Sequence, residues 1–123
     1  TLDCACVDLF TGRCAFYKDG APRSYVLRHG RLTRCELASM PAGILRGITF
    51  AKRTAVLGAG DTVVLLSDGI TDADALGLEA RLCRFLSQEQ QELADTGLPY
   101  AKAHTPADRR DDMSVIVARL LPN

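Results

Sequence analysis

One stretch of the chain decides how its fold is interpreted: Thr62-Val63-Val64-Leu65-Leu66-Ser67-Asp68-Gly69. Residues 62–66 form a continuous apolar run, which is typical of a strand covered on both faces. An acid at the exit of a buried strand is held rigidly and faces solvent at the sheet edge, a suitable place to bind a cation or a substrate. The glycine after it allows a backbone or a ligand to approach closely. Asp-Gly is also a favoured hairpin turn, so a turn without function is the alternative.

A second acidic segment precedes the last strand-like stretch. Arg110-Asp111-Asp112-Met113 comes directly before residues 114–120, whose sequence is SVIVARL. Carboxylates on neighbouring strand ends can share hard divalent cations such as Mg²⁺ or Mn²⁺, which prefer oxygen ligands. By spacing alone, the alternative that Asp111 and Asp112 merely solvate a loop stays open.

Composition indicates one small globular domain without a strong surface field. The 123 residues carry 15 basic and 15 acidic side chains, so no net charge favours nucleic acid or a membrane surface. No apolar run approaches the roughly 20 residues needed to cross a bilayer. The cysteines at positions 4, 6, 14, 35 and 83 form no C-x-x-C pair and leave one unpaired, which fits a reducing cytoplasm. Cys4 and Cys6 are expected to share one strand face as small core residues.

The first half of the chain predicts a meander of antiparallel strands. Consecutive short strands joined by tight turns are expected at residues 2–9, 14–18, 24–28, 32–37 and 49–57, with a loop over 38–45. His29-Gly30-Arg31 is a hairpin signal, and both His29 and His104 are expected on the surface.

Helices are predicted between the two acidic segments. A second helix is expected from about Gln88, with Ser87 and Gln90 as its capping box. Pro99 is expected to interrupt or kink that helix, because proline removes a hydrogen-bond donor. The apolar stripe of the first helix consists of Leu76, Leu78, Leu82, Phe85 and Leu86.

The order of these motifs resembles the metal-dependent serine/threonine protein phosphatases, the PPM family. The pattern is an apolar strand ending in Ser-Asp-Gly, then helices, then Arg-Asp-Asp-Met and a final strand. The closer similarity is to the phosphatase domain of stage II sporulation protein E and related bacterial stress-response phosphatases. Further stretches that carry it are Lys18-Asp19-Gly20-Ala21-Pro22, Ser24-Tyr25-Val26-Leu27-Arg28-His29-Gly30, Met40-Pro41-Ala42-Gly43-Ile44 and Leu57-Gly58-Ala59-Gly60-Asp61.

The resemblance implies an α+β fold, an antiparallel β-sandwich flanked by helices, with two Mn²⁺ or Mg²⁺ ions at one edge. Such ions neutralise the phosphate dianion and acidify a water, so no protein nucleophile is implied. Asp68 and Asp111 match metal-ligand positions of the family. Asp72 and Asp112 are candidate ligands of a peripheral metal, although a solvated loop acid is the alternative for Asp72. Gly69 is expected to act as a backbone spacer.

The resemblance also implies that residues 1–123 are the C-terminal half of such a domain. The family's domain is about twice this length. Its N-terminal half carries another Asp-Gly pair with further metal ligands, whereas Asp19-Gly20 here resembles the family's hairpin. The chain begins with Thr1 rather than Met, which fits an excised or trimmed polypeptide. We expect this chain alone to be inactive, and to self-associate or pair with the missing half through unpaired strand edges.

Three functional interpretations follow. In the first, the parent protein is a cytoplasmic or membrane-anchored phosphatase acting on a phosphoserine protein, such as an anti-sigma-factor antagonist. In this interpretation the segment itself contacts neither nucleic acid nor membrane. In the second, the segment is a non-catalytic interaction module that retains the sandwich. In the third, the acids serve an unrelated Mg²⁺ phosphotransfer fold, against which the consecutive strands argue, because such folds alternate strands and helices.

Overall fold

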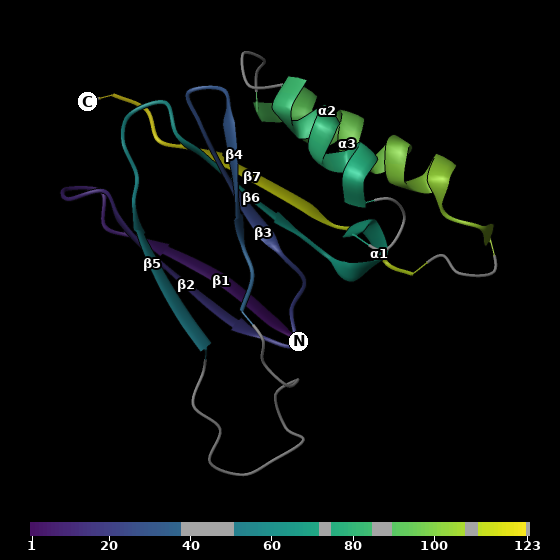
Figure 1. Cartoon of the computed structure of the whole chain (residues 1–123), viewed down its shortest axis with the longest axis horizontal. Helices are drawn as coiled ribbons and strands as arrows, with labels where there is room; N and C mark the ends of the chain where they lie inside the picture. Colours follow the sequence, from purple (N-terminus) through teal and green to yellow (C-terminus); the bar gives the residue numbers. More distant parts are fainter. Residues whose placement is uncertain (38–50, 72–74, 85–89, 108–110, 123) are drawn as a thin grey trace, which may run out of the picture.

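The computed structural model describes residues 1–37, 51–71, 75–84, 90–107 and 111–122. Two antiparallel sheets face each other, and helices cover one of them (Figure 1). The predicted α+β sandwich is confirmed. Its strands are β1 (Leu2–Val7), β2 (Arg13–Asp19), β3 (Ser24–Arg28), β4 (Arg31–Cys35), β5 (Ala51–Val56), β6 (Thr62–Leu66) and β7 (Val115–Arg119), and its helices are α1 (Asp68–Thr71), α2 (Ala75–Arg84) and α3 (Gln90–His104).

The strands do not form the simple meander that was predicted. Sheet A has the order β1-β2-β5, and sheet B has the order β4-β3-β6-β7. The chain therefore crosses between the sheets after β2, after β4 and again after β5. A single meander would have left one broad apolar face open to water, whereas two facing sheets cover each other.

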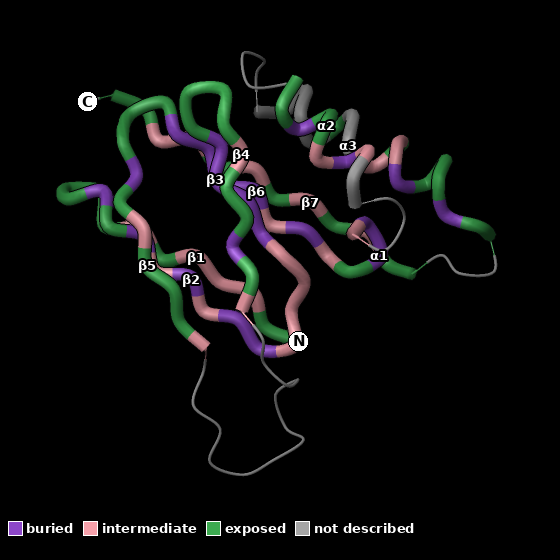
Figure 2. Tube along the Cα trace, in the orientation of Figure 1, coloured by how far each residue is buried: buried purple, intermediate pink, exposed green. Residues whose placement is uncertain are grey.

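Strand β6 lies inside sheet B and is covered on both faces, as predicted (Figure 2). Its alternate residues contribute to different cores, because side chains of a strand point to opposite faces. Val63 packs between the two sheets, while Val64 and Leu66 pack toward the helices. The core between the sheets consists of Cys14, Phe16, Val26, Cys35, Leu57 and Val63, and the core beneath the helices consists of Tyr25, Leu27, Val64, Leu66, Ile70, Leu78, Leu82 and Ala101.

The β3–β4 hairpin has the predicted turn. Arg28 pairs with Arg31, and the two residues between them, His29 and Gly30, have φ angles of 45° and 76°. Two consecutive residues in the left-handed region give a turn whose twist matches that of the flanking strands. His29 is exposed here and His104 is exposed at the end of α3, so the predicted surface placement of both histidines is confirmed.

Pro99 was predicted to interrupt or kink the second helix, and the interruption is wrong, because α3 is continuous across Pro99. Pro99 is exposed, and its neighbours Leu98 and Ala101 pack against the core beneath the helices. This packing outweighs the loss of one backbone hydrogen bond. Leu78 and Leu82 of α2 are buried as predicted. The remaining residues of the predicted stripe and capping box (Phe85, Leu86, Ser87 and the side chains of Leu76 and Gln90) and the loop over 38–45 lie outside the described part.

The prediction that Cys4 and Cys6 are core residues is wrong. They share a face of β1 with their Sγ atoms 3.6 Å apart, but Cys6 is exposed and Cys4 is only half-buried. That face of sheet A points away from sheet B, and no described helix lies over it (Figure 1). Cys14, which is buried between the sheets, behaves differently, since desolvation raises the pKa of its thiol to about 11. Among the described helices, none combines the length and the apolarity that a bilayer-spanning segment requires.

Candidate functional site

The two acidic motifs meet at one end of sheet B. The ladder between β6 and β7 ends with the pair Leu66 and Val115, and hydrogen bonds of Ser67 continue the contact beyond it. The Ser67 N–H donates to the carbonyl of Ser114 over 3.0 Å, and the Ser114 N–H donates to Ser67 Oγ over 2.9 Å. Ser67 Oγ in turn donates to the carbonyl oxygen of Asp112 over 3.0 Å. The strand exit before Asp68 is thus fixed to the segment that carries Asp111 and Asp112.

Gly69 makes this contact close. A Cβ atom at position 69 would lie 2.7 Å from the carbonyl oxygen of Asp112 and 3.2 Å from that of Asp111. Real Cβ atoms essentially never come within 3.0 Å of another heavy atom, so the backbone of the second motif occupies the space that a side chain would need. The residue after Asp68 is a glycine because of this packing.

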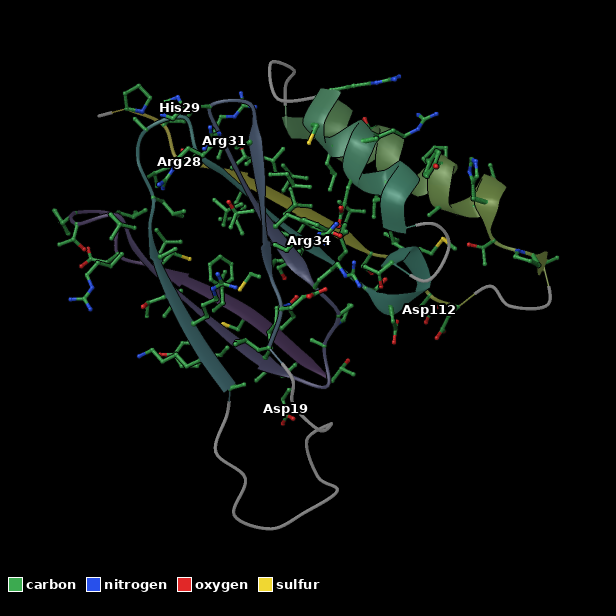
Figure 3. The ribbon with its side chains drawn as sticks, viewed as in Figure 1. Asp19, Arg28, His29, Arg31, Arg34 and Asp112 are labelled. Atoms are coloured by element: carbon green, nitrogen blue, oxygen red, sulfur yellow. The ribbon has the colours of Figure 1, made fainter. Side chains whose placement is uncertain are left out.

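The carboxylates of Asp68 and Asp111 are exposed and held in the same way. Asp68 Oδ1 accepts the N–H of Gly69 over 3.0 Å, and Asp111 Oδ1 accepts the N–H of Asp112 over 2.8 Å. No hydrogen-bond donor among the described residues reaches the second oxygen of either group. Figure 3 shows the side chain of Asp112 beside α1, at the end of sheet B opposite to Arg28, His29 and Arg31. Asp72 lies outside the described residues.

The acids open toward two different hollows. Asp68 lines a cavity of about 190 Å³ between the ends of the two sheets, together with Asp3, Ser67 and Ser114. Asp111 and Asp112 line a hollow of about 430 Å³ against α3, which Lys102 also lines. The acids at the end of sheet B therefore lie between two hollows. One is the cavity between the two sheets, and the other is the hollow against α3.

Oxygen ligands that are exposed and only partly hydrogen-bonded suit a hard divalent cation. The described residues contain no group of three or more His, Cys, Asp or Glu side chains able to hold a metal ion. Asp68 and Asp111 thus fit Mn²⁺ or Mg²⁺ in the chemistry of their donors, but they are a partial ligand set. An ion held here would need ligands from outside the described residues.

Sequence reasoning missed the contribution of Ser67 and of the buried pair Asp3 and Lys18. Ser67 belongs to the motif that was identified, and its place directly after the strand was the available signal. The signal for Lys18 was the alternation of β2, which puts this lysine on the same face as the buried Cys14 and Phe16. A lysine on an apolar strand face requires a partner, and Asp3 on the neighbouring strand is that partner.

Sequence comparison identifies the family of the chain. A family model described as stage II sporulation protein E (SpoIIE) matches residues 1–121. Stage II sporulation protein E of Bacillus subtilis (strain 168) is 26% identical over 126 residues, which cover 98% of this chain and 15% of that protein.

Solved structures agree with the sequence match. The Mn-presoaked phosphatase domain of SpoIIE from Bacillus subtilis is 25% identical and superposes with a TM-score of 0.83, over 100% of this chain and 57% of that one. The Mycobacterium tuberculosis serine/threonine phosphatase PstP/Ppp shares the fold, with a TM-score of 0.73, 22% identity and coverage of 90% of this chain and 56% of that one. The chain thus spans somewhat more than half the length of each of these two solved chains. It belongs to the stage II sporulation protein E family.

Proposed function

We propose that residues 1–123 form the C-terminal half of a metal-dependent protein serine/threonine phosphatase domain. The observation that carries this proposal is the junction of the two acidic motifs, in which Ser67 and Gly69 bring the segments of Asp68 and Asp111 together. The relationship to a solved phosphatase domain supports the reaction class. Because the chain covers 57% of that domain, the activity belongs to a longer polypeptide that contains this chain.

The proposed roles follow from the placement of the acids. Asp68 and Asp111 would hold Mn²⁺ or Mg²⁺, with Asp112 and Asp72 as candidate ligands of a peripheral ion. When bound, such ions neutralise the charge of a phosphate monoester and lower the pKa of a water. Ser67 and Gly69 hold the two acidic segments against each other. No side chain of residues 1–123 is proposed as a nucleophile.

The proposed substrate is a phosphoserine on a regulatory protein, such as an anti-sigma-factor antagonist, in the cytoplasm. Asp68, Asp111 and Asp112 are all exposed, so this acidic edge is open to solvent, as a site for a protein-bound phosphate requires. The expectation of such a substrate comes from the resemblance to this family, whose SpoIIE model matches residues 1–121.

The test uses the longest natural polypeptide that contains this chain. Asp68→Asn and Asp111→Asn preserve the Oδ1 acceptor of each backbone hydrogen bond, so the fold is expected to remain. Mn²⁺-dependent hydrolysis of a phosphoserine peptide should fall by at least about 100-fold in each variant, at or beyond the upper end of losses seen for outer-shell changes at metal sites. Asp8→Asn is the matched control, since Asp8 is an exposed acid that accepts the backbone N–H of Phe10 over 2.9 Å in the β1–β2 turn.

Unchanged hydrolysis in Asp68→Asn and Asp111→Asn would refute the assignment of these residues. A wild-type polypeptide that folds but hydrolyses no phosphoserine peptide with Mn²⁺ or Mg²⁺ would favour the non-catalytic interaction module instead.

A further inference from the structure

A fully buried lysine lies at the end of sheet A that is nearest the acidic motifs. Lys18 has an exposed fraction of 0%, and its Nζ atom lies 2.8 Å from Asp3 Oδ2 and 2.6 Å from Ser24 Oγ. Nζ also donates to the carbonyl oxygen of Pro22 over 2.5 Å. These contacts give each ammonium proton an acceptor, so the lysine is fixed in one orientation.

Asp3, the partner of Lys18, has hydrogen-bond partners for only one of its two carboxylate oxygens. Its Oδ2 atom accepts hydrogen bonds from Lys18 and from Ser24 Oγ, the latter over 2.8 Å. Its Oδ1 atom is buried and has no hydrogen-bond partner among the described residues. A buried acceptor without a donor destabilises the fold, and a buried ion pair is weak evidence of added stability. The arrangement therefore requires a purpose beyond holding the strands together.

The position of Asp3 indicates that purpose. Asp3 lies near the start of β1 and lines the same cavity of about 190 Å³ as Asp68, which lies two residues after the end of β6. The described residues contain no group of three or more potential metal ligands, so Asp3 does not join Asp68 and Asp111 in one coordination shell. Its carboxylate can act across the cavity through a water molecule. Lys18 compensates the charge of Asp3, which keeps the cavity from carrying a second uncompensated anion.

We propose that Asp3 is a positioning residue of the metal site, whose carboxylate accepts a hydrogen bond from a water of the hydrated divalent cation held by Asp68. Lys18 and Ser24 fix the carboxylate for this contact. The inference rests on the proposed function, because it requires a cation at Asp68. Mg²⁺ retains several waters in protein sites, and residues that orient such outer-shell contacts change metal affinity by about 10–100-fold when they are replaced.

The test measures Mn²⁺ affinity by electron paramagnetic resonance of the free ion, in the longest natural polypeptide that contains this chain. The double variant Asp3→Leu/Lys18→Met removes both charges together, which avoids an unpaired buried charge and is often neutral for stability. We expect the urea unfolding midpoint to stay near that of the wild type and the dissociation constant for Mn²⁺ to rise about 10-fold or more. The control Arg34→Met/Glu79→Leu removes an ion pair between β4 and α2 and should leave the affinity unchanged.

Asp68→Asn separates the two proposals in the same assay. If Asp68→Asn leaves the affinity for Mn²⁺ unchanged, the proposed function fails. If Asp68→Asn weakens binding but Asp3→Leu/Lys18→Met does not, only the role of Asp3 is overturned. Should the double variant not fold, Asp3→Asn decides by the same affinity ratio, and failure of both variants to fold would assign the pair to folding alone and overturn the inference.

Discussion

A Cβ atom on Gly69 would lie 2.7 Å from the carbonyl oxygen of Asp112. The two residues belong to motifs more than 40 positions apart in the sequence, and their contact makes a single site of two strand ends. The contact is between backbones, so it does not depend on the rotamer of any side chain. It also explains why the acid at the exit of β6 is followed by a residue without a side chain.

Gly69→Ala is therefore expected to damage the site. The added methyl group meets backbone that cannot rotate away, so either α1 or the Asp111–Asp112 segment must move, at a cost of about 1–3 kcal/mol. Urea unfolding should show this loss, and Mn²⁺ affinity should fall with it. Gly58→Ala is the matched control, because the nearest atom to its Cβ is Asp61 Oδ2 at 3.9 Å, an ordinary contact. Equal stability of the two variants would show that the close approach at Gly69 is not required.

The isolated chain is expected to show no Mn²⁺-dependent phosphatase activity. Asp68 and Asp111 provide a partial ligand set, and hard divalent cations need six or more ligands in a defined arrangement. Hydrolysis of p-nitrophenyl phosphate and of a phosphoserine peptide by residues 1–123 measures this directly, with the longest natural polypeptide as the positive control. Efficient turnover by the 123-residue chain would mean that the site is complete within it.

Acid is expected to loosen the contact between α2 and sheet B through Glu79. Burial alone would raise the pKa of Glu79, but hydrogen bonds from Arg34 and Tyr25 outweigh burial, and the resulting pKa is lowered from its ordinary value of 4.5. A group whose folded-state pKa lies below its unfolded value stabilises the fold above the unfolded pKa. That contribution is lost as the pH falls through the folded-state pKa, so the relevant window lies below pH 4.5.

Glu79→Gln tests this, because glutamine cannot titrate. Urea unfolding midpoints between about pH 5 and about pH 3 should fall less steeply for Glu79→Gln than for the wild type. Glu36→Gln is the control, since Glu36 forms an ion pair with Arg23 but its side chain is 55% exposed. Parallel pH profiles for the wild type and Glu79→Gln would show that the ion pair between Arg34 and Glu79 does not stabilise the contact of α2 with sheet B.

Local sequence signals predicted most elements but not their partners. The apolar run of residues 62–66 and the turn at His29-Gly30 were predictable, because the burial of a strand and the type of a turn depend on residues that are adjacent in the sequence. The division of the strands into two sheets was not, because turn signals locate the end of a strand without saying which sheet the next one joins. The interruption predicted at Pro99 was wrong for a related reason, since the packing that holds α3 together comes from sheet B.

The candidate site shows the same limit. Asp68 and Asp111 were found because each stands at a strand boundary beside a recognisable motif. The pair Asp3 and Lys18 was missed because its members lie 15 positions apart on strands whose pairing sets the contact: Asp3 lies opposite Lys18 in the β1–β2 register. Asp3 meets the cavity of Asp68 only when sheet A is placed on sheet B.

The isolated chain is expected to associate through the groove between β1 and β7. Each of these strands is an edge of its sheet, and the groove of about 240 Å³ between them is lined by Val7, Leu65, Ile116 and other apolar side chains. Ile116 is 60% exposed although it lies on the face of β7 that points toward sheet A. Unpaired edges beside an uncovered apolar surface promote pairing with another chain, either a second copy or the remainder of the phosphatase domain.

Static light scattering of residues 1–123 at micromolar concentration should therefore report a mass above that of the monomer. Ile116→Lys places a charge in the groove and should lower the association without unfolding the chain, because the side chain is mostly exposed. Val56→Lys makes the same change at a 62% exposed position on β5, the opposite edge of sheet A, and should leave the association unchanged. A monomer that unfolds cooperatively would contradict the prediction. It would mean that the groove needs no cover and that the chain is a self-sufficient domain.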